Sequence, residues 1–102
     1  MPSYAVFGIN HHSAGLNLRE KASFLDDQIV PFLKLLKNIG ILECAILSTC
    51  NRVEIYAAVS CHETAKRLIK QSLLLERSSL TENDLASFYY HQDESAVRHL
   101  FG

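Results

Sequence analysis

Two β-like apolar runs separated by only five residues constrain the fold of this chain most strongly. The first run covers residues 41–47 (ILECAIL), and the second covers residues 53–59 (VEIYAAV). In the second run, hydrophobic residues alternate with Glu54 and Tyr56, which predicts a strand with one face drier than the other. Residues 48–52 connect the two runs, so we predict a β-hairpin with its bend in this segment.

Helical patterns stand on both sides of the hairpin. Apolar residues follow helical spacing up to Ile39, after a cap predicted at Asp26 or Asp27, and Gly40 predicts the end of this helix. Residues 63–76 carry apolar side chains along one stripe, which is typical of an amphipathic helix. One helix is therefore expected before the hairpin and one after it.

The remaining elements complete a recognisable order. Residues 4–9 and 88–91 are predicted as a first and a fourth strand, and Asp93 precedes a short last helix of about two turns. The order β-α-β-β-α-β is the ferredoxin-like plan, in the α+β class: an antiparallel sheet with helices on one face. Because the last helix ends in apolar residues, we expect residues 1–102 to be a single domain of a longer protein, with this helix truncated.

Composition narrows the class of function. Ten basic and eleven acidic residues give a formal charge of -1, so no broad positive surface for nucleic acid or membrane is expected. The three cysteines lack a CxxC spacing, and no signal peptide or membrane-spanning run is visible, which favours a cytoplasmic protein with free thiols. Cys44, inside an apolar run, is expected in the core, and Cys61 is expected to be structural.

Cys50 lies in the hairpin bend, within the segment STCNR, and is the candidate nucleophile. A cysteine attacks as the thiolate, which Arg52 can favour electrostatically. Thr49 and Asn51 can donate hydrogen bonds to that anion or to a developing oxyanion. The alternative interpretation is that Cys50 is a small apolar residue used for packing.

The five histidines do not form a metal-binding pattern. His11 and His12 are adjacent in a loop, and no histidine pair has the spacing of a zinc ligand set. No metal site is expected. His99 lies on the last helix, where a partly buried histidine is the plain interpretation, and spacing alone does not connect it to Cys50.

Three segments together carry a family resemblance: GINHHSAGLNLREKASF (8–24), LSTCNRVEIYA (47–57) and YYHQDESAVRHLFG (89–102). Over essentially the whole chain they resemble the N-terminal catalytic domain of glutamyl-tRNA reductase. STCNR-x-E is the most specific part. One departure is His12, where the family usually has lysine or arginine after the first loop histidine.

The resemblance implies an NADPH-dependent enzyme that reduces glutamate esterified to its tRNA to glutamate-1-semialdehyde, the first step of tetrapyrrole and haem biosynthesis. It implies that Cys50 is the nucleophile and forms a thioester with the glutamyl group. Thr49, Asn51 and Arg52 match positions around the glutamyl substrate, with Arg52 suited to its carboxylate. His99 matches a histidine with an acid–base or orienting role.

The resemblance also implies parts that this chain lacks, namely a Rossmann-type NADPH domain and a helical dimerisation domain. The four glycines are scattered and no G-x-G-x-x-G is present, so no cofactor-binding residue is expected here. We expect the full-length protein to be a homodimer and to meet the aminomutase that takes the semialdehyde. The fragment alone is expected to lack reductase activity and at most to hydrolyse glutamyl-tRNA.

Two alternatives remain open at this stage. A ferredoxin-like regulatory or binding domain would hold a protein or RNA partner, although the aromatic run 88–90 is expected to pack rather than to stack on bases. A generic cysteine hydrolase would need a histidine within reach of the Cys50 thiol.

Overall fold

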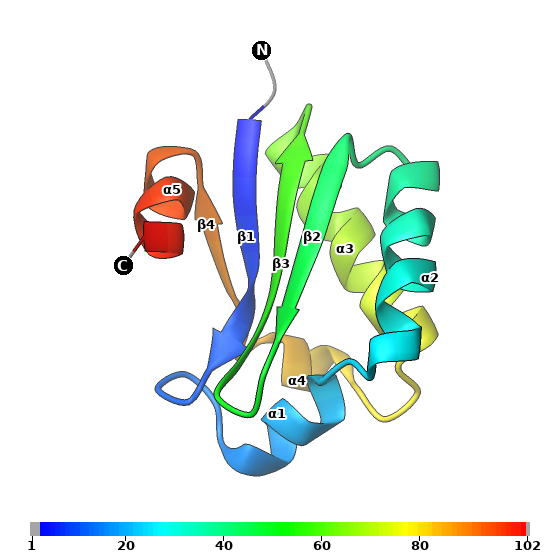
Figure 1. The fold of residues 1–102 in the computed structure, drawn as a ribbon, viewed down its shortest axis with the longest axis vertical. Coiled ribbons are helices and arrows are strands. Elements are labelled where there is room, and N and C mark those ends of the chain that lie inside the picture. Colours follow the sequence, from blue (N-terminus) through cyan, green and yellow to red (C-terminus); the bar gives the residue numbers. More distant parts are fainter. Residues whose placement is uncertain (1–2, 102) are drawn as a thin grey trace.

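The computed structural model of this chain describes residues 3–101, and its four strands form one antiparallel sheet (Figure 1). The strands are β1 (Ser3–Asn10), β2 (Glu43–Ser48), β3 (Arg52–Val59) and β4 (Tyr89–Gln92). Their order across the sheet is β2-β3-β1-β4. This order and the antiparallel pairing confirm the predicted ferredoxin-like α+β fold, and the hairpin of β2 and β3 lies where the sequence predicts it.

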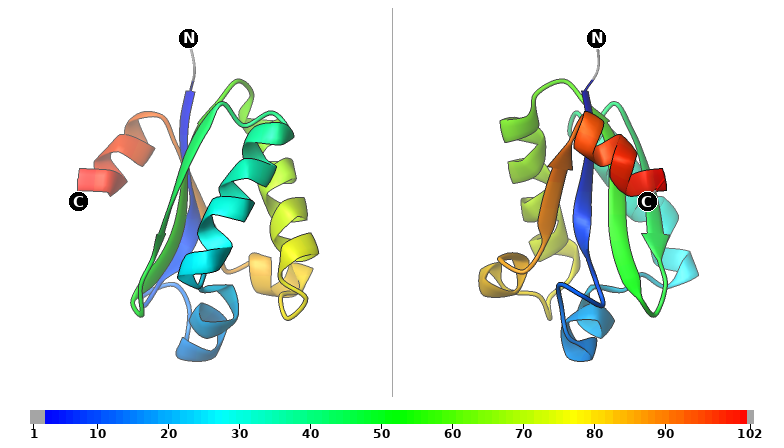
Figure 2. Two further views of the ribbon diagram at one scale, coloured as in Figure 1. Left: turned by 45° about the vertical axis from the view of Figure 1, so that its right-hand side comes forward. Right: turned by 90° about the vertical axis from the view of Figure 1, so that its left-hand side faces the viewer.

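Two helices cover one face of the sheet, and the last helix lies on the opposite face (Figure 2). The helices are α1 (Leu16–Ala22), α2 (Asp26–Asn38), α3 (His62–Glu76), α4 (Glu82–Leu85) and α5 (Glu94–Phe101). Helices α2 and α3 run side by side on the first face, whereas α5 packs against β1 and β4. The sequence predicts α5 but does not indicate the face that it covers.

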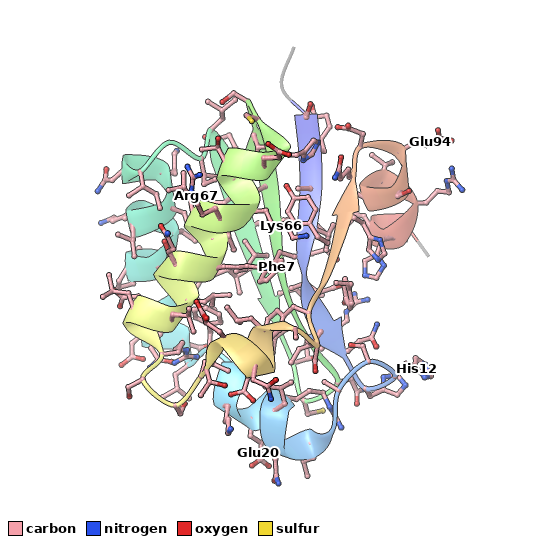
Figure 3. All side chains as sticks on the ribbon, turned by 180° about the vertical axis from the view of Figure 1, so that it is seen from behind. Phe7, His12, Glu20, Lys66, Arg67 and Glu94 are labelled. Carbon is pink, nitrogen blue, oxygen red and sulfur yellow. The ribbon has the colours of Figure 1, made fainter. Side chains whose placement is uncertain are left out.

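The main core fills the space between the sheet and the pair α2 and α3. Alternate side chains of β1 and β3 point into it, and Figure 3 shows Phe7 between the sheet and α3. The ring of Phe7 stacks on Phe88, with centroids 5.0 Å apart. The least exposed large side chains of this core are Phe7, Ile9, Leu36, Ile55, Ile69 and Leu73. Each contributes about 1.5–3 kcal/mol by leaving water, so this layer fixes the sheet on which the site is built.

The ends of α2 show one prediction that is wrong and one that is confirmed. The N-cap residue is Leu25 rather than Asp26 or Asp27, and its amide donates to the side chain of Gln28 (2.9 Å). Both aspartates lie in the first turn, where negative charge still favours the positive end of the helix dipole. Gly40 follows the helix with a φ of +116°, a conformation that side chains disfavour, as its predicted place at the helix end requires.

The opposite face of the sheet is formed by the other set of alternating side chains of β1 and β3. Helix α5 covers part of this face, where Val6 and Ala96 are both buried. Because α5 contacts β1 and β4, it brings His99 over the sheet at the end where the β2–β3 loop lies. This packing positions the candidate site.

Candidate functional site

The bend between β2 and β3 is a tight turn closed by Thr49. The amide of Thr49 donates to the carbonyl of Arg52 (2.8 Å). The hydroxyl oxygen of Thr49 accepts hydrogen bonds from the amides of Asn51 and Arg52 (both 3.2 Å). Arg19 of α1 donates to the carbonyl of Cys50 and holds the tip of the turn against that helix. The Thr49 hydroxyl is therefore used to build the turn that presents Cys50.

All three cysteines are free thiols in the described part of the chain, but their surroundings differ. Cys50 is exposed at the tip of the turn. Cys44 is half-buried against the core, as predicted, and burial raises the pKa of its thiol. Cys61 is exposed beside the start of α3, where a hydrogen bond from the amide of Thr64 lowers the pKa of its thiol. Cys50 and Cys61 are thus the two exposed thiols.

A polar hollow of about 460 Å³ lies beside the turn. Its lining residues are Asn10, His11, His12, Thr49, Asn51, Arg52 and His99. The structure therefore brings His99 together with three residues of the turn, an arrangement that residue spacing alone does not predict. Cys50 stands between Thr49 and Asn51 but is not itself among the lining residues. The loop that follows β1 and carries His12 forms another wall (Figure 3).

A buried carboxylate lies next to this hollow on β3. Glu54 is 0% exposed, and its Oε1 accepts a hydrogen bond from Tyr56 (2.7 Å) and lies 3.5 Å from Nε of Arg52. Its Oε2 accepts hydrogen bonds from Tyr89 (2.5 Å) and from Nε2 of His99. Three hydrogen-bonded side chains and one guanidinium, from β3, β4 and α5, thus converge on one carboxylate.

Gly8 makes room for this carboxylate. Gly8 of β1 pairs directly with Glu54 of β3 and, on its other side, with Tyr89 of β4. A Cβ atom on Gly8 would lie 2.8 Å from Cα and 2.9 Å from Cγ of Glu54. The missing side chain therefore lets Glu54 lie across β1 toward Tyr89 and His99.

The cluster holds a negative charge at neutral pH. Burial by itself would raise the pKa of Glu54, but hydrogen bonds from Tyr89, Tyr56 and His99 outweigh it, and the pKa lies below its ordinary value. Burial and the bond to Glu54 raise the pKa of Tyr56 to about 12 and raise that of Tyr89 as well. Both phenols therefore keep their protons and act as donors to the carboxylate.

Sequence reasoning missed Glu54, Tyr89 and Gly8. The alternation in β3 predicts which face Glu54 points to, and that face was expected to be the wetter one. The available signal was a charged residue within the motif STCNR-x-E. The aromatic run 88–90 is predicted to pack, and Phe88 and Tyr90 do so. The hydroxyl of Tyr90 is also hydrogen-bonded to Nδ1 of His62 (2.8 Å).

The residues of this chain do not fit a dinucleotide. The Rossmann turn needs closely spaced glycines between a parallel strand and a helix, whereas the sheet here is antiparallel and the glycines are scattered. Within residues 3–101, no group of three or more histidine, cysteine or acidic side chains could hold a metal ion. The same residues contain no helix that is long and apolar enough to cross a membrane.

The fold and the site define a ferredoxin-like α+β domain that presents a cysteine beside a polar hollow. The family model of the N-terminal domain of glutamyl-tRNA(Glu) reductase matches residues 7–102. Glutamyl-tRNA reductase of Heliobacterium mobile is 42% identical over 98 residues, which are 94% of this chain and 22% of that protein. The enzyme of Pseudomonas aeruginosa PAO1 is 40% identical over 100 residues, 96% of this chain and 23% of that protein.

A solved structure agrees with these matches. Glutamyl-tRNA reductase from Methanopyrus kandleri superposes with a TM-score of 0.65 and 26% identity, over 96% of this chain and 21% of that chain. The chain therefore belongs to the family of glutamyl-tRNA reductase N-terminal domains. It spans about a fifth of the length of the curated relatives that it matches.

Proposed function

We propose that this chain is the domain of an NADPH-dependent glutamyl-tRNA reductase that transfers the glutamyl group from its tRNA to Cys50. The observation that carries the proposal is the exposed Cys50 thiol, held at the tip of a tight turn at the edge of a hollow. Family membership supports the substrate, because the relatives are named glutamyl-tRNA reductases. The product of the whole enzyme would be glutamate-1-semialdehyde, for tetrapyrrole and haem biosynthesis.

The transfer step exchanges the oxygen ester of glutamyl-tRNA for a thioester on Cys50. Sγ of Cys50 attacks the carbonyl carbon of the glutamyl ester, a C–S bond forms, and the C–O bond to the tRNA ribose breaks. The proton of the thiol is released, and the ribose oxygen leaves with its electron pair and takes up a proton. Sulfur donates less electron density into the carbonyl than oxygen does, so the thioester carbon is the better acceptor for a later hydride. That reduction would use NADPH held by residues outside this chain.

Arg52 is suited to hold the side-chain carboxylate of the glutamyl group. Its Nε faces Glu54 at 3.5 Å, the side chain is 43% exposed, and Arg52 lines the hollow. A guanidinium held on one edge can bind a carboxylate through its terminal nitrogens. Asn51, on the same wall, adds an amide that can accept or donate a hydrogen bond. Thr49 contributes the turn that places both residues.

The wider assignments follow from the same family membership and belong to the proposal. The full-length protein would be a homodimer in the cytoplasm, where thiols such as Cys50 stay reduced. It would pass the semialdehyde to an aminomutase. The role of His99 would be acid–base or orienting, and its place in the hollow beside Asn51 supports this.

Release of glutamate from glutamyl-tRNA tests the proposal on this chain. Without a hydride donor, the thioester on Cys50 would be lost to water, so slow release of free glutamate is expected. Cys50→Ser should abolish the release, whereas Cys61→Ser, which changes the other exposed thiol, should leave it intact. Equal release by wild type and Cys50→Ser would overturn the proposal.

A further inference from the structure

We propose that Glu54 is a positioning residue that fixes the ring orientation and tautomer of His99, so that Nδ1 of His99 carries protons during transfer to Cys50. This inference rests on the proposed function and adds a role for a buried side chain that the sequence did not indicate. It concerns the one fully buried acidic group among the described residues.

The geometry sets the tautomer. A carboxylate only accepts hydrogen bonds, so Nε2 of His99, which is bonded to Oε2 of Glu54, must carry the hydrogen. A neutral imidazole has a single N–H, and Nδ1 then keeps its lone pair. Within residues 3–101, Nδ1 of His99 forms no hydrogen bond. His99 also lines the hollow beside Thr49 and Arg52, where the reacting ester would lie.

The ring is held in place from several elements. It contacts Tyr89 and His91 of β4, with ring centroids 5.1 Å and 4.8 Å away. Burial lowers the pKa of His91, which therefore favours the neutral form beside His99. Glu54 in turn is held by Tyr89, Tyr56 and Arg52. The carboxylate can thus neither rotate away from His99 nor lose its charge at neutral pH.

The charge on Glu54 serves the proton transfer in both directions. When Sγ of Cys50 attacks, Nδ1 of His99 takes the thiol proton and the ring becomes an imidazolium. The Glu54 carboxylate stabilises that cation, as acidic residues do in serine-protease triads. As the C–O bond breaks, the imidazolium gives the proton to the ribose oxygen. The proton moves from sulfur to oxygen and Glu54 is never protonated.

A second explanation is that the carboxylate only anchors α5 to the sheet. A buried carboxylate is a poor anchor, because taking it out of water is costly unless every partner is in place. Gly8 is also required to make room for it. The two explanations differ in their effect on the imidazole, and a test can separate them.

The test combines a spectroscopic readout with a rate. Nitrogen-15 NMR of the imidazole should show His99 of the wild type with its hydrogen on Nε2. In Glu54→Gln, whose amide can donate to Nε2, that preference should be lost. Formation of the glutamyl adduct on Cys50, followed by mass spectrometry, should slow at least about 100-fold, the usual loss when acid–base catalysis is removed. His99→Asn should slow it equally, and the double variant should be no slower than either single one.

Tyr89→Phe is the matched control. It removes the other hydrogen bond to Oε2 of Glu54 but keeps the aromatic ring beside His99. In Tyr89→Phe, His99 should keep its hydrogen on Nε2. The fold-reduction in the rate of adduct formation should be less than about a tenth of that in Glu54→Gln. An anchoring role alone would affect the two variants alike.

Two results would contradict the role of Glu54. A wild-type His99 with its hydrogen on Nδ1, or wild-type adduct formation by folded Glu54→Gln, would overturn the inference. If Glu54→Gln does not fold, the wild-type NMR measurement still decides the tautomer. If the wild type forms no adduct, the proposed function fails and the role in transfer fails with it, while the NMR result separately decides whether Glu54 fixes the ring.

Discussion

Substitution of Gly8 by alanine tests how the buried carboxylate is accommodated. The new Cβ would lie 2.3 Å from the carbonyl oxygen of Val53 and 2.8 Å from Cα of Glu54, both backbone atoms that cannot rotate away. Overpacking of this kind costs about 1–3 kcal/mol. Separating Glu54 from its partners would add the penalty of a buried charge that has lost its partners, about 3–5 kcal/mol if complete.

We therefore expect Gly8→Ala to lose about 1–3 kcal/mol of unfolding free energy from overpacking, and more to the extent that Glu54 is displaced from its partners. Each kcal/mol lost should lower the Tm by about 4–8 °C. Circular dichroism during thermal and urea unfolding measures both quantities. Gly15→Ala is the matched control, because a Cβ on Gly15 meets nothing within 4 Å and φ is -72°. Gly15 is the N-cap of α1, so this control should lose no more than about 1 kcal/mol. Equal stability of the two variants would refute the account of Gly8.

Three further predictions concern charge and thiol reactivity. Arg52→Gln should reduce the rate of glutamyl transfer about 10- to 100-fold, the value of a hydrogen bond to a charged group, and mass spectrometry of the adduct measures it; an unchanged rate would contradict a substrate role. Because the pKa of Glu54 is lowered on folding from 4.5, its contribution to stability is present above that pH and is lost as the pH falls below it. In urea unfolding, Glu54→Gln should accordingly lose less stability than the wild type as the pH falls below about 5. An identical pH dependence of the two proteins would argue against a buried, ionised Glu54. Iodoacetamide should modify Cys61 before Cys44, because burial raises the pKa of Cys44 whereas amide hydrogen bonds lower that of Cys61; the reverse order would exclude these assignments.

The order of elements could be predicted because each element is encoded locally. Alternation marks β3, helical spacing and Gly40 mark α2, and the five-residue connection marks the hairpin. The first turn of α2 was harder, since either Asp26 or Asp27 could cap it, and the structure uses Leu25 instead. Such a shift of one residue depends on packing that local patterns do not contain.

Only the part of the site that is formed by residues adjacent in the sequence could be predicted from residue patterns. Residues 49–52 are adjacent in sequence, so a turn necessarily places them together. His99 and Glu54 are brought together by the register of β1 on β3 and by the choice of sheet face for α5, which are long-range properties. Glu54 also contradicts the expectation that the polar side of β3 is wet, because α5 and β4 cover it. The pairing of Glu54 on β3 with Gly8 on β1 indicates that the carboxylate is buried. This pairing cannot be recognised when each strand is considered by itself.

The most direct test of the account is the identity of the residue that carries the glutamyl group. This chain would be mixed briefly with glutamyl-tRNA, quenched in acid and digested, and each cysteine peptide would be examined by mass spectrometry. The account predicts one glutamyl group on the peptide that contains Cys50 and none on those of Cys44 and Cys61. An adduct on Cys61 alone, or no adduct on any cysteine while the tRNA remains charged, would contradict it.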